Sequence, residues 1–550
     1  MIAEFYAGRT ILLTGGTGFL GQGLAAKILR SLPGIRRLYV LVRPRRLPGG
    51  VVRPAAERLE TELFGAAVMA RFRREDPPGF ASARERTRAV DFDMSAPDLG
   101  LDPAVRAELV DEVDCIIGAA ATVVFDEPLD RAIQVNTLGP LRLLEFARQC
   151  RKQVVYVHVS TAYVSGTLTG PIAETPLPAD RTIAQLRDGG PGGFDPEVEI
   201  AACQAYCDAV RAEACGQAQE QRFRQQIVAQ HRGRRLTEQR LQTLLEDRRK
   251  RWIEARLTRE GTRRAQAYGW NDVYTFTKAM GEQMLTRRRG GLPLVIVRPS
   301  IVESSLEDPE PGWVFGLKVA DPLIVGYGRG QVPDFPTSRH VVMDLVPVDI
   351  VVNTIIAAAA CAETARVRVF HAATSGVRPL AMQQLYGYVR SYFLAHPLRG
   401  RNGEVPALPA WTFPTHAAFM RRFRWRYLGP LRLQQWLLER LPERPALASR
   451  RRRLAAQEKR LLRVLYYTEL FGPYTKLNCR FQLDSMRALH ASLPAAEQRV
   501  FNMDVERIDW QTYFHQIHIP GLRRHVLSEG QAAHTALDEA LLDTGDEGAQ

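Results

Sequence analysis

The most informative stretch of this sequence is Thr14-Gly15-Gly16-Thr17-Gly18-Phe19-Leu20-Gly21, which follows an apolar run over residues 9–15 and precedes a helical pattern. Gly15 permits a tight turn out of a strand, Gly18 lets the backbone approach a pyrophosphate, and Gly21 lets the helix pack closely on a sheet. The N–H groups at the helix start then face the anion. This context favours a dinucleotide cradle over a plain glycine-rich loop.

Short apolar runs and helical stretches alternate beyond the cradle. Helical patterns fill the chain between the runs, and the runs themselves are typical of buried parallel strands. This alternation predicts an α/β fold, a Rossmann-like doubly wound parallel sheet. The further strands are expected over residues 38–42, 113–117, 154–159 and 294–297.

Changes of composition divide the rest of the chain. An Arg-, Gln- and Glu-rich segment at about 200–266 holds no strand pattern and is expected to be a helical insertion with a solvated face. The predicted organisation is a cofactor-binding domain over 1–375 that carries this insertion, a helical connector region over 376–454, a smaller, mainly helical C-terminal domain over 455–527, and a disordered tail over 528–550.

Composition limits the function classes. The chain has 550 residues, 45% hydrophobic and 24% charged, which excludes wholesale disorder and fibrous repeats. The most apolar stretch, 345–360, is shorter than a membrane span and contains Asp349 and Asn353, so we expect buried core there. No signal peptide is visible, and the seven scattered cysteines suggest reduced thiols, a cytoplasmic location and no metal site.

The net charge of +14 does not identify a partner by itself. Only seven of the 74 basic residues are Lys, and such an Arg bias often reflects the base composition of the coding DNA. The other interpretation is attraction to an anionic partner, such as a phosphate-bearing cofactor, an acidic carrier protein, a membrane surface or nucleic acid. Because no nucleic-acid-binding motif is recognisable, we expect no nucleic-acid partner.

The end of the second predicted strand indicates which dinucleotide is bound. It reads Leu41-Val42-Arg43-Pro44-Arg45-Arg46 and offers no carboxylate to grip a ribose 2′-hydroxyl. Arg43 stands where a cation would meet a 2′-phosphate, so NADP(H) is favoured over NAD(H). We include Arg46 among the cofactor contacts and interpret Arg45 as a surface residue.

Tyr274 and Lys278 form a Tyr-x-x-x-Lys pair on one face of a predicted helix. A nearby ammonium favours the phenolate, so we expect the pKa of Tyr274 to fall towards neutrality, which suits a general acid for a carbonyl oxygen. Upstream, Ser160 and Thr161 lie at the carboxyl end of a predicted strand, the edge that lines the ligand crevice in open parallel sheets. Either hydroxyl can donate to the same carbonyl oxygen.

Taken together, these motifs resemble the extended short-chain dehydrogenases/reductases. More narrowly, the chain resembles the alcohol-forming fatty acyl-CoA reductases, and the bacterial ones most closely, over roughly residues 7–525. The stretches that carry this narrower resemblance are Ala119–Phe125, Asn136–Gly139, His158–Val164, Tyr274–Lys278, Val297–Glu303, Glu310–Trp313, Val346–Asp349 and the C-terminal Phe501–Tyr513.

The resemblance implies an NADPH-dependent reductase that converts a long-chain fatty acyl-CoA, or an acyl carrier protein thioester, through an aldehyde to a primary alcohol. It implies Tyr274 as proton donor and Thr161, with Ser160 as the alternative, as the second hydroxyl. Lys278 would lower the Tyr274 pKa and hold the nicotinamide ribose, and Ser300 and Ile301 would meet the nicotinamide amide through their backbone. The implied cofactor contacts are Thr14, Gly15, Thr17, Gly18, Phe19, Leu20, Gly21, Arg43, Arg46, Asp93, Met94, Ala120, Ala121, Asn136, Tyr274, Lys278, Ser300 and Ile301.

Other functions remain open on sequence grounds. A reductase that releases the aldehyde, or a dehydrogenase for sugar nucleotides or steroids, would share the fold. A cofactor-binding protein without catalysis would not need Thr161, Tyr274 and Lys278 together.

A further expectation concerns residues 417–438, where Arg alternates with Phe, Trp and Tyr. Its aromatics are expected in a core with Arg stems at the edge, and the alternative is peripheral contact with a membrane.

Overall fold

The computed structural model describes residues 1–47, 50–231, 236–400, 403–441 and 445–527. Its centre is a seven-stranded sheet in the order β13-β9-β7-β6-β1-β2-β5, in which every neighbouring pair is parallel. The predicted fold class is therefore confirmed. The strands are β1 (Thr10–Thr14), β2 (Arg37–Val42), β5 (Thr87–Asp91), β6 (Cys115–Gly118), β7 (Val155–Val159), β9 (Leu294–Pro299) and β13 (Arg368–Ala372).

The strand order reverses at β1. The chain goes from β1 to β2 on one side and later returns to place β6 on the other side, with Ile11 opposite Cys115 and Thr14 opposite Gly118. In open parallel sheets, ligands bind in the crevice beyond the carboxyl ends of the strands at such a switch point. The cradle directly follows β1, so it lies at this crevice.

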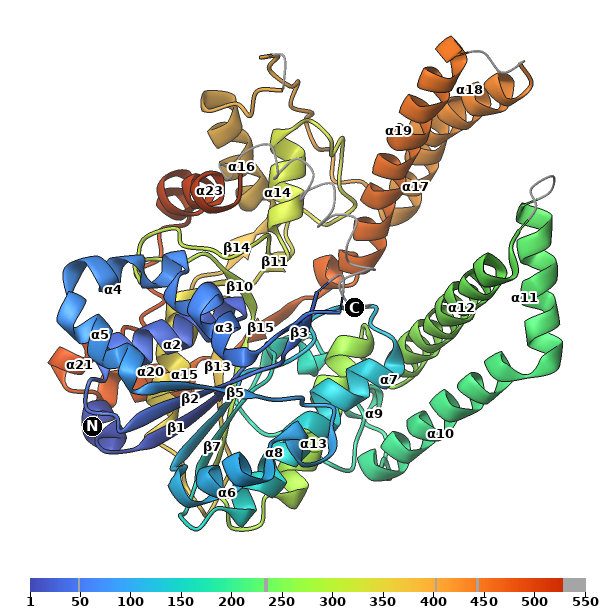
Figure 1. Cartoon of the computed structure of the whole chain (residues 1–550). Helices are drawn as coiled ribbons and strands as arrows, with labels where there is room; N and C mark the ends of the chain where they lie inside the picture. Colours follow the sequence, from blue (N-terminus) through green and yellow to red (C-terminus); the bar gives the residue numbers. More distant parts are fainter. Residues whose placement is uncertain (48–49, 232–235, 401–402, 442–444, 528–550) are drawn as a thin grey trace.

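Helices cover both faces of the sheet (Figure 1). On one face, α2 (Phe19–Ser31) packs against α15 (Val348–Ala359), which also contacts β7 and β9. On the other face lie α8 (Gly139–Gln149) and α13 (Val273–Arg288), which contact each other. Most of the apolar stretch at 345–360 forms α15, whose twelve residues are all buried, as expected for core.

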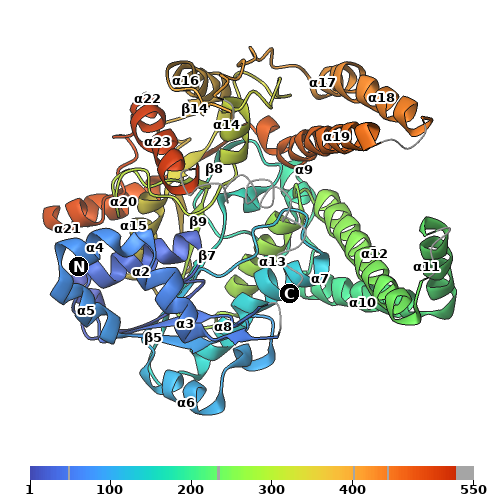
Figure 2. The ribbon, with the colours of Figure 1, turned by 45° about the horizontal axis from the view of Figure 1, so that its top comes forward.

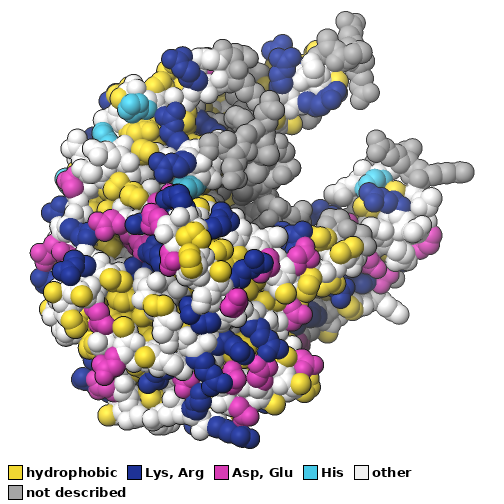
Figure 3. Space-filling model, turned by 60° about the vertical axis from the view of Figure 1, so that its left-hand side comes forward, with side chains coloured by type: hydrophobic (Ala, Val, Ile, Leu, Met, Phe, Trp, Pro, Cys, Tyr) yellow, Lys and Arg dark blue, Asp and Glu magenta, His cyan; other side chains and the backbone are white. Residues whose placement is uncertain are grey.

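The predicted insertion forms three helices, α10 (Pro196–Cys215), α11 (Gln217–Gln230) and α12 (Glu238–Ala267). They extend from the body of the protein as an arm, seen from two directions in Figures 1 and 2. Phe223, Ile227 and Leu245 form a small separate core within it. Over the body of the protein, the face drawn in Figure 3 shows basic side chains among acidic ones.

A second arm is built by α17 (His416–Phe423), α18 (Gly429–Glu439) and α19 (Pro445–Phe471) (Figures 1 and 2). Phe419 and Phe423 are buried in it and pack towards α19, as the core interpretation of residues 417–438 expects. Trp425, by contrast, is 79% exposed. Helix α19 crosses the predicted domain boundary at residue 454, and the predicted tail over 528–550 lies outside the described residues.

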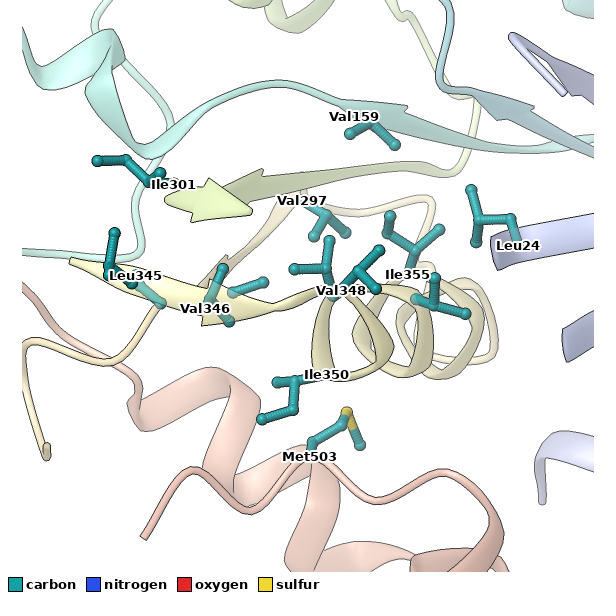
Figure 4. Close-up of a cluster of buried hydrophobic side chains, with 14 of the residues drawn as sticks. Leu24, Val159, Val297, Ile301, Leu345, Val346, Val348, Ile350, Ile355 and Met503 are labelled. Atoms are coloured by element: carbon teal, nitrogen blue, oxygen red, sulfur yellow. The ribbon is translucent and has the colours of Figure 1, made fainter. Parts of the chain in front are cut away.

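The C-terminal segment returns to the body and shares its core. Strand β15 (Cys479–Phe481) pairs with β8 (Gly170–Ile172), and it is followed by α20 (Asp484–Ser492), α21 (Ala495–Val500), α22 (Trp510–Thr512) and α23 (Ile519–Leu522). Met503 belongs to the same cluster as Ile350 of α15 and Val297 of β9 (Figure 4). Among the described residues, no helix is long and apolar enough to cross a membrane.

Candidate active site

The cradle has the geometry that its glycines predict. Gly15 has a φ of +75°, and a Cβ there would approach the backbone nitrogen of Ala120 to 2.9 Å. A Cβ on Gly21 would lie 2.0 Å from the carbonyl oxygen of Gly15, so helix α2 can pack this closely only with glycine there. Gly18 is the N-cap of α2 in an extended conformation, and no side chain caps this helix end. Its N–H groups are therefore available to an anion.

A cavity of about 400 Å³ opens from this cradle and contains the predicted catalytic residues. Much of its remaining wall is apolar and comes from α14 (Asp321–Gly328), α16 (Met382–Ala395) and the segment before α17. The predicted site residues that line the cavity are Gly15, Gly18, Phe19, Leu20, Gly21, Ala121, Thr161, Tyr274, Lys278, Ser300 and Ile301.

Tyr274 and Thr161 both line the cavity. Thr161 directly follows β7, and Tyr274 lies in the first turn of α13. Burial raises the pKa of Tyr274 above its ordinary value, and the neighbouring Thr161 side chain has a smaller effect that lowers it. The expectation of a Tyr274 pKa near neutrality is therefore wrong for this structure, because burial outweighs the effect of Thr161.

Lys278 lies one turn further along α13, with its side chain buried. Its ammonium donates to the carbonyl oxygen of Val159 at 2.7 Å, at the end of β7. Burial lowers the pKa of Lys278 to about 8, with the nearby Glu282 carboxylate acting in the opposite direction. The group is therefore mostly protonated at neutral pH and is held beside the hydroxyl pair.

Ser160 stays an alternative to Thr161. Its buried hydroxyl lines the cavity and has no hydrogen-bond partner within the described part of the chain. The buried hydroxyl of Ser300 also lines the cavity and has no hydrogen-bond partner among the described residues. The backbone N–H groups of Ser300 and Ile301 donate to the carbonyls of Ala372 and Asp344. A backbone contact from these two residues to a nicotinamide amide must therefore use their carbonyl oxygens.

The other predicted cofactor residues lie outside the cavity wall. The Thr14 hydroxyl accepts from the Ala120 N–H at 3.0 Å and ties β1 to the loop after β6. The Asn136 amide is occupied by the backbone of Thr122 and the hydroxyl of Thr277. Their roles toward a cofactor stay predictions. Asp93 and Met94 lie in the loop after β5, where Met94 is buried, and Arg43 and Arg46 are exposed at and beyond the end of β2.

Arg58 is a site residue that sequence reasoning missed. It lies on α3 (Ala55–Leu59), where no motif marks it. Its guanidinium donates to the Thr17 hydroxyl at 3.3 Å and to the carbonyl oxygen of Arg43, and it is paired with Glu62. Arg58 thus joins the cradle to the end of β2, the region where a 2′-phosphate is recognised in this fold.

The C-terminal segment also contributes to the site. Tyr474 lines the cavity, and its hydroxyl donates to the carboxylate of Asp272. Asp272 is the N-cap of α13 and accepts the Thr275 N–H at 2.8 Å. Tyr474 therefore holds the start of the helix that carries Tyr274 and Lys278. No local pattern in the sequence could reveal this contact, because about 200 residues separate its partners.

The residues present fit a nicotinamide dinucleotide. The uncapped start of α2 offers N–H groups to a pyrophosphate. At Gly15 and Gly21 there is no room for a Cβ, so the cradle is lined there by backbone atoms. The cavity continues from there to the hydroxyl pair Thr161 and Tyr274. A dinucleotide in the cradle would therefore extend its reactive ring towards these hydroxyls.

Comparison with known proteins agrees with this assignment. Family models described as male sterility protein match residues 13–355 and 447–529. Among solved structures, the terminal R domain of the myxalamid PKS-NRPS biosynthetic pathway aligns with a TM-score of 0.55 at 16% identity, covering 95% of this chain and 92% of that one. That likeness supports the fold.

Curated relatives match over nearly the whole chain. Fatty acyl-CoA reductase 1 of Arabidopsis thaliana is 31% identical, covering 96% of this chain and 99% of the relative. The alcohol-forming fatty acyl-CoA reductase of Simmondsia chinensis is 30% identical with the same coverage. Fatty acyl-CoA reductase 1 of Gallus gallus is 27% identical, covering 96% and 86%. The chain belongs to the fatty acyl-CoA reductase family, within the extended short-chain dehydrogenase/reductase superfamily.

Proposed function

We propose that this protein is an NADPH-dependent reductase that converts long-chain fatty acyl-CoA through an aldehyde to a primary alcohol. The observation that carries the proposal is one continuous cavity, which joins a dinucleotide cradle, the hydroxyls of Thr161 and Tyr274, and an apolar wall. An acyl carrier protein thioester is the alternative acyl donor. The choice of NADPH as cofactor, of acyl-CoA as substrate and of an alcohol as product rests on this cavity together with the family.

The apolar wall supports a long acyl chain as substrate. Beyond the hydroxyl pair, the cavity is bordered by Tyr327, Phe335, Tyr386 and Trp411, whose rings pack against one another with centroids 5.0 to 5.8 Å apart. Ile324, Met382, Leu385 and Val389 complete this end. Such a lining gains free energy from burying methylene groups and offers few hydrogen-bond partners to a sugar or nucleoside.

The hydroxyl pair would serve both reduction steps. When bound, NADPH would supply a hydride to the thioester carbonyl carbon. The hemithioacetal would then break its C–S bond, with its hydroxyl proton passing to the sulfur, to release coenzyme A and leave the aldehyde. A second NADPH would supply the hydride that reduces the aldehyde. In each hydride transfer negative charge develops on the same oxygen, where Thr161 donates a hydrogen bond and Tyr274 donates its proton. Because burial raises the pKa of Tyr274, the phenol keeps its proton at neutral pH and is available as the acid.

A substrate comparison tests this function. NADPH oxidation by the purified protein should be fast with palmitoyl-CoA and with hexadecanal. It should be at background with a UDP-sugar and with a ketosteroid, the substrates of other enzymes with this fold. Turnover of either of the latter two above palmitoyl-CoA would assign the cavity to another substrate class.

Arg58 and Arg43 together support NADPH as the cofactor. Arg58→Gln should raise the KM for NADPH by about tenfold or more, because a charged hydrogen bond to the 2′-phosphate is lost, and should leave kcat nearly unchanged. Arg43→Gln is the parallel variant, and Arg45→Gln, whose side chain is exposed, is the control. Steady-state kinetics with NADPH and NADH measure the effect. Equal use of NADH and NADPH by the wild-type protein would contradict the assignment.

The second arm supports a peripheral contact with anionic membranes. Trp425 and Leu433 are 79% and 57% exposed, and Arg421, Arg424 and Arg426 are exposed near them. Exposed apolar and basic side chains within one short helical segment are typical of contact with an anionic lipid interface.

We expect weak, salt-sensitive co-sedimentation with anionic liposomes. Trp425→Ser should reduce it, because the variant removes an aromatic side chain that is 79% exposed. Val228→Ser, at an exposed position of the first arm, should leave it unchanged. Equal recovery on neutral and anionic vesicles, or none on either, would contradict this contact.

A further inference from the structure

Lys318 reaches the cradle from a separate part of the chain. It lies in the segment that precedes α14 and lines the cavity together with Gly18, Phe19 and Leu20. Its ammonium is 4.5 Å from the centre of the Phe19 ring. Lys318 is one of only seven lysines in the chain, and the family resemblance assigned it no role. Its place therefore calls for a physical explanation.

The segment that carries Lys318 is fixed against helix α2. The Trp313 ring packs on the Phe19 ring with centroids 5.1 Å apart. Lys27 of α2 pairs with Asp308 at 2.7 Å in the same segment. These two contacts hold the segment beside the cradle, so Lys318 approaches the start of α2 in a defined position.

A buried cluster holds the backbone of Lys318. Asp321 accepts the backbone N–H of Lys318 at 2.6 Å, and its carboxylate lies 3.1 Å from Nε2 of His518. Glu303, at the end of β10 (Ile301–Glu303), completes a group that is fully buried. His518 comes from the C-terminal segment, so this segment also helps to fix the lysine.

The charges of the cluster favour a protonated Lys318. Burial and the neighbouring Asp321 raise the pKa of Glu303, which favours a neutral Glu303. Asp321 acts against burial and favours the charged ammonium of Lys318. Burial lowers the pKa of Lys318 to about 8, so the group is mostly charged at neutral pH.

Glu303, Asp321 and His518 have ligand atoms close enough to hold a metal ion. Because this cluster accepts the backbone N–H of Lys318, we interpret it as the support of the segment that carries the lysine.

We propose that Lys318 is a second binding group for the pyrophosphate of the dinucleotide, in addition to the N–H groups at the start of α2. A pyrophosphate carries two negative charges, and a helix N-terminus supplies only partial positive charge. A full charge next to Phe19 would balance the remainder. Coenzyme A also contains a pyrophosphate, and the position of Lys318 at the cradle residues favours the dinucleotide as the source.

Equilibrium binding without turnover tests the proposal. Fluorescence titration of purified protein should show that Lys318→Met weakens NADPH and NADP⁺ by about 10- to 100-fold, as expected for a lost hydrogen bond to a charged group. Adenosine 2′-monophosphate, which has no pyrophosphate, should bind both proteins alike. Lys318→Arg should stay within a few-fold of wild type. The matched control is Lys250→Met, which removes an exposed lysine of α12.

Two further readouts separate the proposal from its alternatives. The rise in melting temperature on adding NADP⁺ should be smaller in Lys318→Met and in Lys318→Gln than in wild type. Unchanged NADP⁺ affinity with lower stability of the free protein would overturn the proposal and leave a structural role. Unchanged NADP⁺ affinity with weaker coenzyme A binding would overturn it in favour of the acyl donor. Neither readout depends on which substrate is reduced.

Discussion

Tyr274→Phe should lower kcat by about 10²- to 10⁴-fold with both palmitoyl-CoA and hexadecanal, the range that general acid catalysis supplies. The phenol is the proton donor in the proposed chemistry, and its neighbours in the cavity, Thr161 and Lys278, cannot replace it at the same place. The substitution removes one oxygen and keeps the ring, which packs edge-on against Phe125. Affinity for NADPH, measured by fluorescence titration, should therefore stay near the wild-type value.

The paired variants Thr161→Ala and Ser160→Ala are the control for this assignment. The Thr161 side chain lies close enough to Tyr274 to lower its pKa, whereas the Ser160 hydroxyl has no partner among the described residues. Thr161→Ala should therefore cost more activity than Ser160→Ala. The reverse order would give Ser160 the second hydroxyl role. A Tyr274→Phe protein with activity within a few-fold of wild type would remove Tyr274 from the mechanism altogether.

Lys278→Met should lower kcat by about 10- to 100-fold, because a buried ammonium beside the hydroxyl pair and the cofactor site is lost. Burial lowers the pKa of Lys278 to about 8. The wild-type kcat should therefore fall above about pH 8, where this ammonium loses its proton. Burial raises the pKa of Tyr274 further above its ordinary value, so the phenol does not titrate in this range.

The Lys278→Met profile should lack the step near pH 8, and a pH series of kcat from pH 6 to 9.5 measures it. Lys152→Met, at a partly exposed position away from the cavity, should keep the wild-type profile. A step that persists in Lys278→Met would assign the titration to another group.

The sequence predicts the centre of the sheet better than its edges. Strands β1, β2, β6, β7 and β9 were expected because each is a continuous apolar run, as strands buried on both faces are. The missed strands are those at the two ends of the sheet, β5 and β13. In β5, Arg88 is exposed and only Val90 is buried, and in β13, Arg368 and His371 interrupt the apolar run. Edge strands carry a weaker hydrophobic signal for this reason.

The site residues also fall into those that the sequence predicts and those that it does not. Residues within one motif, such as Gly15 to Gly21 or Tyr274 and Lys278, were placed together because their spacing alone defines their geometry. Arg58 and Lys318 could not be found, because tertiary packing brings them to the cradle from segments without a motif. The pKa of Tyr274 was misjudged for a related reason. Spacing shows that a lysine is near, whereas burial depends on the whole fold.

The amount of NADPH consumed per fatty alcohol formed tests the proposed function most directly. Purified protein is incubated with a limiting amount of palmitoyl-CoA and excess NADPH, and NADPH, free coenzyme A, hexadecanal and hexadecanol are measured at completion. The proposal predicts about two NADPH per coenzyme A released, with hexadecanol as the final product, since each hydride transfer reduces the same carbon once. One NADPH per coenzyme A with accumulating hexadecanal would contradict it.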